Sequence, residues 1–244
     1  KGPGAIEAVV TPFFTGSLLP SSGLSVAPTA AQLTDIEVFS DNEVGQVQAR
    51  LRSPDNSLSE VSAGLHATYS AQRADFGLTA YQGRDPLPQA HGEMWVTGFQ
   101  TDSDRVDFAV PLVYPQRMLL ALDARGELGF GVSGWFEIAL NFPDMTALTA
   151  SRSQLEALVQ LGTIEELPDP LPSFTTQDGD PYVNWIAGFD RSFDSLHISM
   201  QWLHGFPTER QKSDLKDYLV LYTRARLSDN WVCLLYTSPS PRDI

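Results

Sequence analysis

The sequence predicts an all-β protein, an antiparallel up-and-down transmembrane β-barrel fragment in which about eight strands are visible. Apolar and polar residues alternate with a period of two through most of residues 61–227, which is the pattern of strands with one apolar face. The connections between these segments are alternately short and long. Up-and-down strands then place the short turns on one side and the long loops on the other, as in transmembrane barrels.

Each expected strand follows from its own alternation. The segment at 106–124 keeps its phase across Pro111 and Pro115, so one long strand is expected there, although proline interrupts a hydrogen-bond ladder. The expected strands are 61–70, 76–81, 106–124, 128–142, 182–191, 196–206 and 217–227, with a weaker one at 5–13. Short turns are expected at 71–75, 125–127, 192–195 and 228–230, and long loops at 14–59, 83–104, 143–181 and 207–216.

One helix is expected, over 152–161 in the third long loop. Ser153 followed by Glu156 fits a capping box. Leu155, Leu158 and Val159 share one face at helical spacing. Such a helix can fold over the mouth of a barrel, or it is an ordinary surface helix of the loop.

Composition excludes several classes of protein. The 244 residues include 16 Lys and Arg and 30 Asp and Glu, a net charge of −14. A non-specific nucleic-acid binder needs a basic footprint, so no nucleic-acid partner is expected. Charged residues make up only 19% of the chain, which excludes a wholly disordered protein, and no apolar run reaches the ~18–20 residues of a transmembrane helix. A membrane barrel remains, and so does a soluble sandwich that buries its apolar faces.

The last residues have a separate interpretation. Residues 233–243, CLLYTSPSPRD, resemble the translation of a common transposase sequencing adapter. We therefore expect 233–244 to be adapter-derived, without fold or function, and 1–232 to be a fragment of a single outer-membrane β-barrel domain. The only cysteine, Cys233, lies in the excluded segment, so no disulfide framework is expected.

The alternation assigns residues to the two faces of the wall. Aromatic rings favour membrane interfaces, and the girdle candidates on the outward face are Tyr69, Phe76 and Phe193 near the short turns and Phe142, Trp185 and Trp202 near the long loops. Inward charges can set the solute preference of a pore, or only pair with one another. The expected lumen-lining residues are Asp107, Arg117, Asp123, Glu137, Asn141, Asn184, His197, Ser199, Gln201, Tyr222, Arg224 and Arg226.

Several segments also resemble a known group of proteins. They are EAVVTPFF, SLLP, YPQRMLLALDARGELG, WFEIAL with Phe142-Pro143, NWIAGFDRSF and LHISMQWLHGF. Together they resemble an uncharacterised family of Gram-negative outer-membrane β-barrel proteins, over most of residues 5–227. The resemblance implies a barrel in the bacterial outer membrane, in contact with its lipid and lipopolysaccharide. It implies no substrate and no catalytic residue.

Catalytic signals are weak, and no enzyme, cofactor or metal site is expected. The sequence has no G-x-S-x-G, H-E-x-x-H, P-loop or dinucleotide motif. His197 and Ser199 share a face, but both are expected inward, away from lipid. The loop carboxylates of Glu165, Glu166, Asp169, Asp178 and Asp180 could hold a divalent cation, but they lack an EF-hand order and are interpreted as a solvated acidic loop.

The expected function is therefore a porin-like channel or transporter for a small solute. One alternative is a structural or adhesive barrel that acts through the loops 14–59 and 143–181. The others are an outer-membrane lipid hydrolase and a soluble secreted sandwich.

Overall fold

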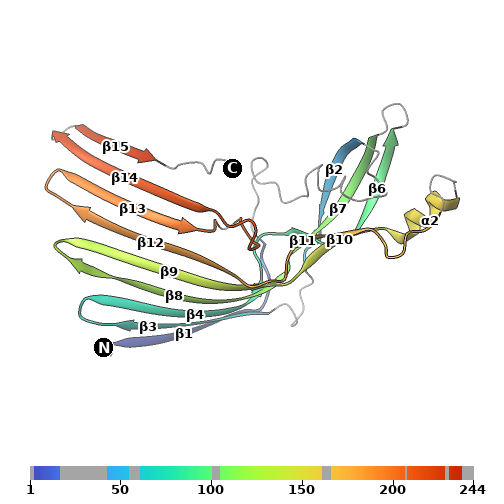
Figure 1. The fold of residues 1–244 in the computed structure, drawn as a ribbon. Helices are drawn as coiled ribbons and strands as arrows, with labels where there is room; N and C mark the ends of the chain where they lie inside the picture. The colour runs from blue at the N-terminus through green and yellow to red at the C-terminus, as the bar shows by residue number, and fades with distance from the viewer. Residues whose placement is uncertain are drawn as a thin grey trace.

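The computed structural model describes residues 3–16, 43–54, 61–100, 105–160, 166–206, 208–228 and 231–237. These residues form two β-sheets and one helix, so the all-β prediction is confirmed. Figure 1 shows the larger sheet on one side and the smaller sheet on the other, with the helix beyond the smaller sheet. Among the described helices, none has the length and apolar character to cross a membrane.

The larger sheet has nine strands, and every neighbouring pair in it is antiparallel. The strands follow one another in chain order, apart from strands that belong to the other sheet. Their order across the sheet is β1 (Gly4–Thr11), β3 (Ser62–Ser70), β4 (Ala74–Arg84), β8 (Gln116–Gly129), β9 (Val132–Pro143), β12 (Tyr182–Ser192), β13 (Leu196–His204), β14 (Asp217–Ser228) and β15 (Trp231–Thr237).

This nine-stranded sheet is open. Its two edges are β1 and β15, so the described strands do not form the closed barrel that the sequence predicts. The central strands β4, β8, β9 and β12 have 11, 14, 12 and 11 residues, and a barrel strand of ~9–11 residues crosses a bilayer. The sheet therefore has the strand length and the up-and-down order of a barrel wall without its closure.

Two details of the strand prediction are wrong. The segment 106–124 is not one strand, because β7 (Arg105–Val113) ends before Tyr114 and Pro115, and β8 begins at Gln116 in the other sheet. The turn expected at 125–127 lies instead at Phe130 and Gly131. Gly129 and Gly131 there have φ of 100° and 71°, a left-handed backbone that glycine adopts readily.

The smaller sheet has six strands, of which five come from the segments expected to be long loops and one, β7, from the expected strand 106–124. Its path is β11 (Ser173–Gln177), β10 (Thr146–Ala150), β6 (Gly92–Gln100), β7 and β2 (Glu43–Leu51), and β5 (Gln89–Ala90) also pairs with β7. The β10–β6 and β2–β7 pairs are parallel. Three of the connections at the long-loop end of the nine-stranded sheet therefore contain strands of a second sheet.

This six-stranded sheet contains the hydrophobic core. Apart from Tyr182 on β12, every buried hydrophobic residue among those described lies between residues 90 and 155. Phe108, Val110 and Leu148 are 0% exposed, and Leu155 of the helix is 1% exposed. The core is Ala90, Met94, Val106, Phe108, Val110, Leu112, Leu148, Ala150 and Leu155.

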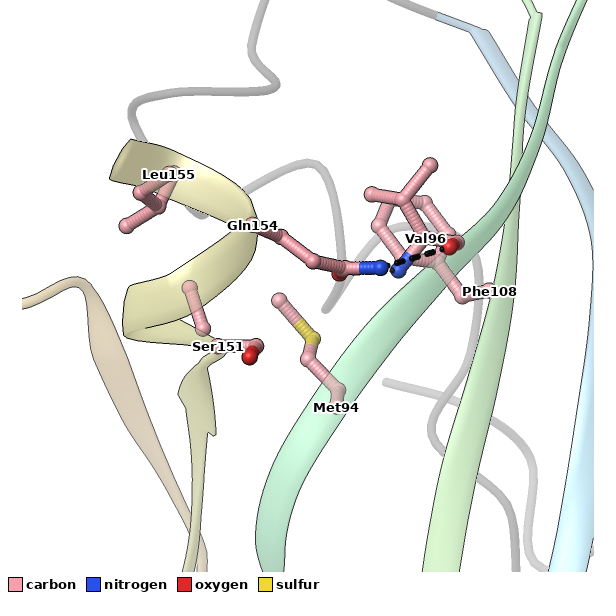
Figure 2. A pocket seen from close by; sticks show the side chains of 7 residues that line it. Met94, Val96, Phe108, Ser151, Gln154 and Leu155 are labelled. Carbon is pink, nitrogen blue, oxygen red and sulfur yellow. Dashed lines mark hydrogen bonds between the residues drawn. The ribbon is translucent and has the colours of Figure 1, made fainter. Parts of the chain in front are cut away.

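The expected helix is present and packs on the six-stranded sheet. Helix α2 spans Arg152–Gln160 among the described residues, and because it begins at Arg152, Ser151 rather than Ser153 precedes it. Leu155 and Gln154 line a small apolar pocket together with Met94, Val96 and Phe108, and Figure 2 shows the Gln154 side chain extending from the helix to Val96. Gln154 accepts a hydrogen bond from the Val96 N–H (2.8 Å) and donates one to the Val96 C=O (2.9 Å). The pairing of β10 with β6 ends at Ala150, which lies opposite Met94. The side-chain amide of Gln154 therefore continues the hydrogen bonding along β6, at Val96.

The segment expected to have no fold is structured in part. Residues 231–237 form β15, whose register with β14 runs from Ser228↔Trp231 to Leu221↔Thr237. The expectation is therefore wrong for Cys233–Thr237 as regards fold, whereas residues 238–244 lie outside the described residues. The adapter origin of 233–244 stays a prediction.

Candidate functional site

The strand register separates the nine-stranded sheet into two chemically different faces. Directly paired residues on antiparallel strands lie on the same face, so the register row Leu78, Leu122, Ile138 and Trp185 defines one of them. We call this the apolar face. Its exposed large side chains include Ile6 (76%), Leu65, Leu78, Met118, Leu120, Leu122 (55%), Phe136, Phe189, Leu219 and Leu235. None of these side chains is packed into the core, which lies in the other sheet.

Aromatic residues stand near the ends of the strands on the apolar face. At the short-turn end Tyr69 pairs directly with Phe76, and the Arg191 guanidinium lies 4.6 Å from the ring centroid of Phe193 in the β12–β13 turn. Phe142 lies one residue before the end of β9. All the predicted girdle residues that lie in strands thus fall on this face by register, and their contact with lipid stays a prediction.

The long-loop end of the same face carries an aromatic cluster with polar partners. The Trp185 and Trp202 ring centroids are 5.0 Å apart. The Trp202 Nε1–H donates to Asp217 Oδ1 at 3.1 Å, and His204 Nδ1 lies 3.1 Å from the same oxygen. Rings that combine an apolar body with a hydrogen-bonded edge are the type found at membrane interfaces. The sequence indicated the two tryptophans and an interfacial or hydrogen-bonded His204, but it gave no indication that Asp217 is the partner of Trp202 and His204.

The opposite face, which we call the polar face, carries most of the predicted lumen residues. Asp123 pairs with Glu137, Ser199 with Tyr222, and His197 with Arg224. By the same registers and alternation, this face holds Arg117, Asp123, Glu137, Asn141, Asn184, His197, Ser199, Gln201, Tyr222, Arg224 and Arg226. It also carries apolar residues such as Leu119, Ile186 and Leu203. That these residues line a lumen stays a prediction.

Asp107 is the one predicted lumen-lining residue that does not lie on the polar face, so the prediction is wrong for this residue. It lies on β7 of the six-stranded sheet, opposite Gly98 of β6, and its Oδ1 accepts a hydrogen bond from the Gln46 N–H at 2.6 Å. The error arises because Asp107 shares an alternation phase with Arg117 and Asp123, although the chain passes from one sheet to the other at Pro115.

A hollow of about 380 Å³ lies at the centre of the polar face. Thr79, Asp123, Glu137 and Asn184 contribute its polar lining, and the Asn141 Nδ2–H donates to Asn184 Oδ1 at 2.8 Å. The Asp123 carboxylate lies directly over Gly77, so a Cβ there would collide with it. Large polar side chains are thus accommodated beside glycine, and the centre of the face stays open.

A buried ion cluster lies at the long-loop end of the nine-stranded sheet, and no sequence pattern indicated it. Asp85 follows β4, Arg117 begins β8, and Arg210 lies between β13 and β14. Asp85 Oδ2 accepts from Arg210 Nη1 at 2.6 Å and Arg117 Nη1 at 3.3 Å. Asp85 is 4% exposed and Arg210 6%. Removing one partner from such a buried pair typically costs about 3–5 kcal/mol, so this cluster holds the start of the β4–β5 connection against β8 and the β13–β14 connection.

The histidine and carboxylate candidates for catalysis or metal binding are not assembled into a site. His197 Nδ1 lies 2.9 Å from Ser192 Oγ, and no hydrogen bond between His197 and Ser199 is found. Glu165 lies outside the described residues. Over the residues that are described, no three His, Cys, Asp or Glu side chains lie close enough together to hold a metal ion.

Comparisons with known proteins add no relative. No protein-family model, curated protein or solved structure matches the chain. The similarity to outer-membrane barrel proteins therefore stays a prediction from the sequence.

Proposed function

We propose that the nine-stranded sheet is part of the wall of a bacterial outer-membrane β-barrel. The observation that carries this proposal is the apolar face, where large aliphatic and aromatic side chains are exposed together rather than packed in a core. Contiguous apolar patches beyond a few hundred Å² are rare on soluble monomers. Lipid would bury each of these side chains with a gain of about 1.5–3 kcal/mol.

Two further observations support a membrane location over a soluble sandwich. A sandwich would pack its apolar face against a second sheet, whereas the six-stranded sheet has its own core and continues from the strand ends of the nine-stranded sheet. The Trp185–Trp202 cluster at one end of the face, and Tyr69 with Phe76 at the other, match the two interfacial belts of a barrel.

Within such a wall the polar face would line the interior. We propose that the barrel admits a small solute, because the hollow at Asp123, Glu137 and Asn184 is open rather than filled. Closure requires strands that pair with both edges of the sheet. Lipopolysaccharide and outer-membrane lipid are the proposed surroundings of the apolar face.

A second candidate is an adhesive or structural barrel. The observation that favours it is the six-stranded sheet, a folded unit at the long-loop end that could contact other molecules. The lipid-hydrolase alternative has no such support, because His197 contacts Ser192 rather than Ser199.

Detergent partition followed by conductance tests the proposal. The full chain, refolded in detergent, should enter the detergent-rich phase on cloud-point separation and should insert into lipid vesicles. Recovery in the aqueous phase as a folded monomer would contradict a membrane wall. If the chain inserts, planar-bilayer recording decides the solute pathway: stepwise conductance supports a channel, and a silent bilayer with unimpaired insertion favours the structural candidate.

A further inference from the structure

A second, smaller hollow lies on the polar face at the short-turn end. Its volume is about 150 Å³, and it is formed by the β12–β13 turn together with two arginines of β14. The lining residues are Ser192, Phe193, Asp194, Ser195, Leu196, His197, Arg224 and Arg226.

The backbone around this hollow is held in place by hydrogen bonds. The Phe193 N–H donates to the Leu196 C=O at 2.7 Å and closes the turn, and the Arg226 N–H donates to the Ser195 C=O at 2.7 Å. The second bond fixes the turn against β14. The hollow is therefore preorganised, which lowers the entropy cost of binding a ligand.

Positive charge is concentrated at the hollow. Arg224 lies directly opposite His197 on the neighbouring strand, and Arg226 follows two residues later on the same face. Both arginines are exposed, and neither forms an ion pair with a described carboxylate. Asp194 is the only acidic residue of the lining. In a chain with a net charge of −14, this is a local excess of the opposite sign.

His197 is oriented beside the two arginines. Its Nδ1 lies 2.9 Å from Ser192 Oγ, and its ring meets that of Tyr222 edge-on with 6.0 Å between centroids. Its other ring nitrogen has no hydrogen bond to a described residue. A hydroxyl, an imidazole and two guanidinium groups thus surround one space of about 150 Å³.

We propose that this hollow binds a small oxyanion, a phosphate group carried either by a free solute or by a lipid headgroup. Guanidinium groups bind phosphate through paired, charge-assisted hydrogen bonds, and such an anion would relieve the repulsion between Arg224 and Arg226. The proposal goes beyond a barrel wall. It stands on the geometry of the β12–β14 turn region and does not depend on closure or conductance.

Titration of the full chain in detergent micelles with inorganic phosphate tests the binding. Calorimetry should show saturable binding that weakens with added salt. The double variant R224Q/R226Q should lose affinity by about tenfold or more, because both charge-assisted contacts are removed. The matched control is R191Q, because Arg191 precedes the same turn but lies on the apolar face by register and does not line the hollow; it should bind as the unmodified chain does.

A second arm distinguishes the two sources of phosphate. Vesicles of phosphatidylcholine with and without phosphatidylglycerol are mixed with the same three proteins. If R224Q/R226Q loses affinity for inorganic phosphate, the hollow is assigned to a free solute. If it loses affinity only for phosphatidylglycerol vesicles, the hollow is assigned to a lipid headgroup. The proposal is overturned if the double variant matches the unmodified chain in both arms, or if R191Q loses as much. Circular dichroism and detergent partition of each variant separate this outcome from loss of the fold or of the membrane wall.

Discussion

The two sheets of this protein place similar alternating strands in opposite environments. In the six-stranded sheet, Phe108 and Leu148 are fully buried under the sheet's own packing and α2. In the nine-stranded sheet, the corresponding apolar side chains are exposed, with Leu78 at 52% and Leu122 at 55%. An alternating pattern thus shows that a strand has one apolar face. Only the structure shows whether that face is packed in a core or exposed.

Because of this difference, the two sheets are stabilised by different interactions. A packed core stabilises the six-stranded sheet in water through burial and close contact. The nine-stranded sheet lacks that contribution and gains it only when its apolar face leaves water. The two regions should therefore respond differently to mutation and to lipid.

The largest expected effect is on the core of the six-stranded sheet. Replacing Phe108 by Ala should lower the free energy of unfolding by about 3–5 kcal/mol, because it leaves a cavity in a packed core. Urea titration in detergent, followed by tryptophan fluorescence, measures it. The control is F130A, since Phe130 is 94% exposed in the β8–β9 turn. A loss below about 1 kcal/mol for F108A would contradict the assignment of the core.

A charge introduced on the apolar face should lower the stability somewhat less, and only when the chain is folded in a membrane. L122R should destabilise the chain folded in vesicles by about 2–4 kcal/mol, the cost of arginine facing mid-bilayer lipid. A121R, one residue earlier on the polar face, is the matched control and should cost less. Urea titration in vesicles measures both variants. Equal costs at the two positions would remove the distinction between the faces.

The smallest expected effect concerns the helix contact of the six-stranded sheet. Q154L keeps the side-chain size but removes both hydrogen bonds to Val96, and should cost about 1–3 kcal/mol by leaving partly buried backbone groups unpaired. Q160L, at an exposed position of the same helix, is the control. Hydrogen exchange at the Val96 amide measures the change. Unaltered protection in Q154L would show that this side chain does not stabilise β6.

Local patterns predicted the parts of the structure that depend on local sequence. Alternation located most strands of the nine-stranded sheet and assigned Asp123, Glu137 and Arg224 to one face, because side-chain direction in a strand follows from sequence position alone. The helix was predicted for the same reason, since Leu155 and its neighbours repeat at helical spacing.

Contacts between distant segments could not be predicted. The parallel pairing of β2 with β7 joins segments about sixty residues apart and leaves no local signature. Asp107 was misplaced because the alternation phase continues across Pro115 while the chain changes sheet. The Asp85 cluster was missed because Arg117 of β8 and Arg210 of the β13–β14 connection lie far from Asp85 in the sequence.

The order of strands across the nine-stranded sheet has a consequence for how the chain folds. Most of its strands pair with the next strand available along the chain, and β8–β9 and β12–β13 are closed by only two or three residues. Such hairpins close early, because short loops cost little entropy. The six-stranded sheet needs β2, β7 and β10 from three separate connections, and non-local pairing is slow. The wall should therefore begin to assemble hairpin by hairpin, and the unit at its long-loop end should be completed afterwards.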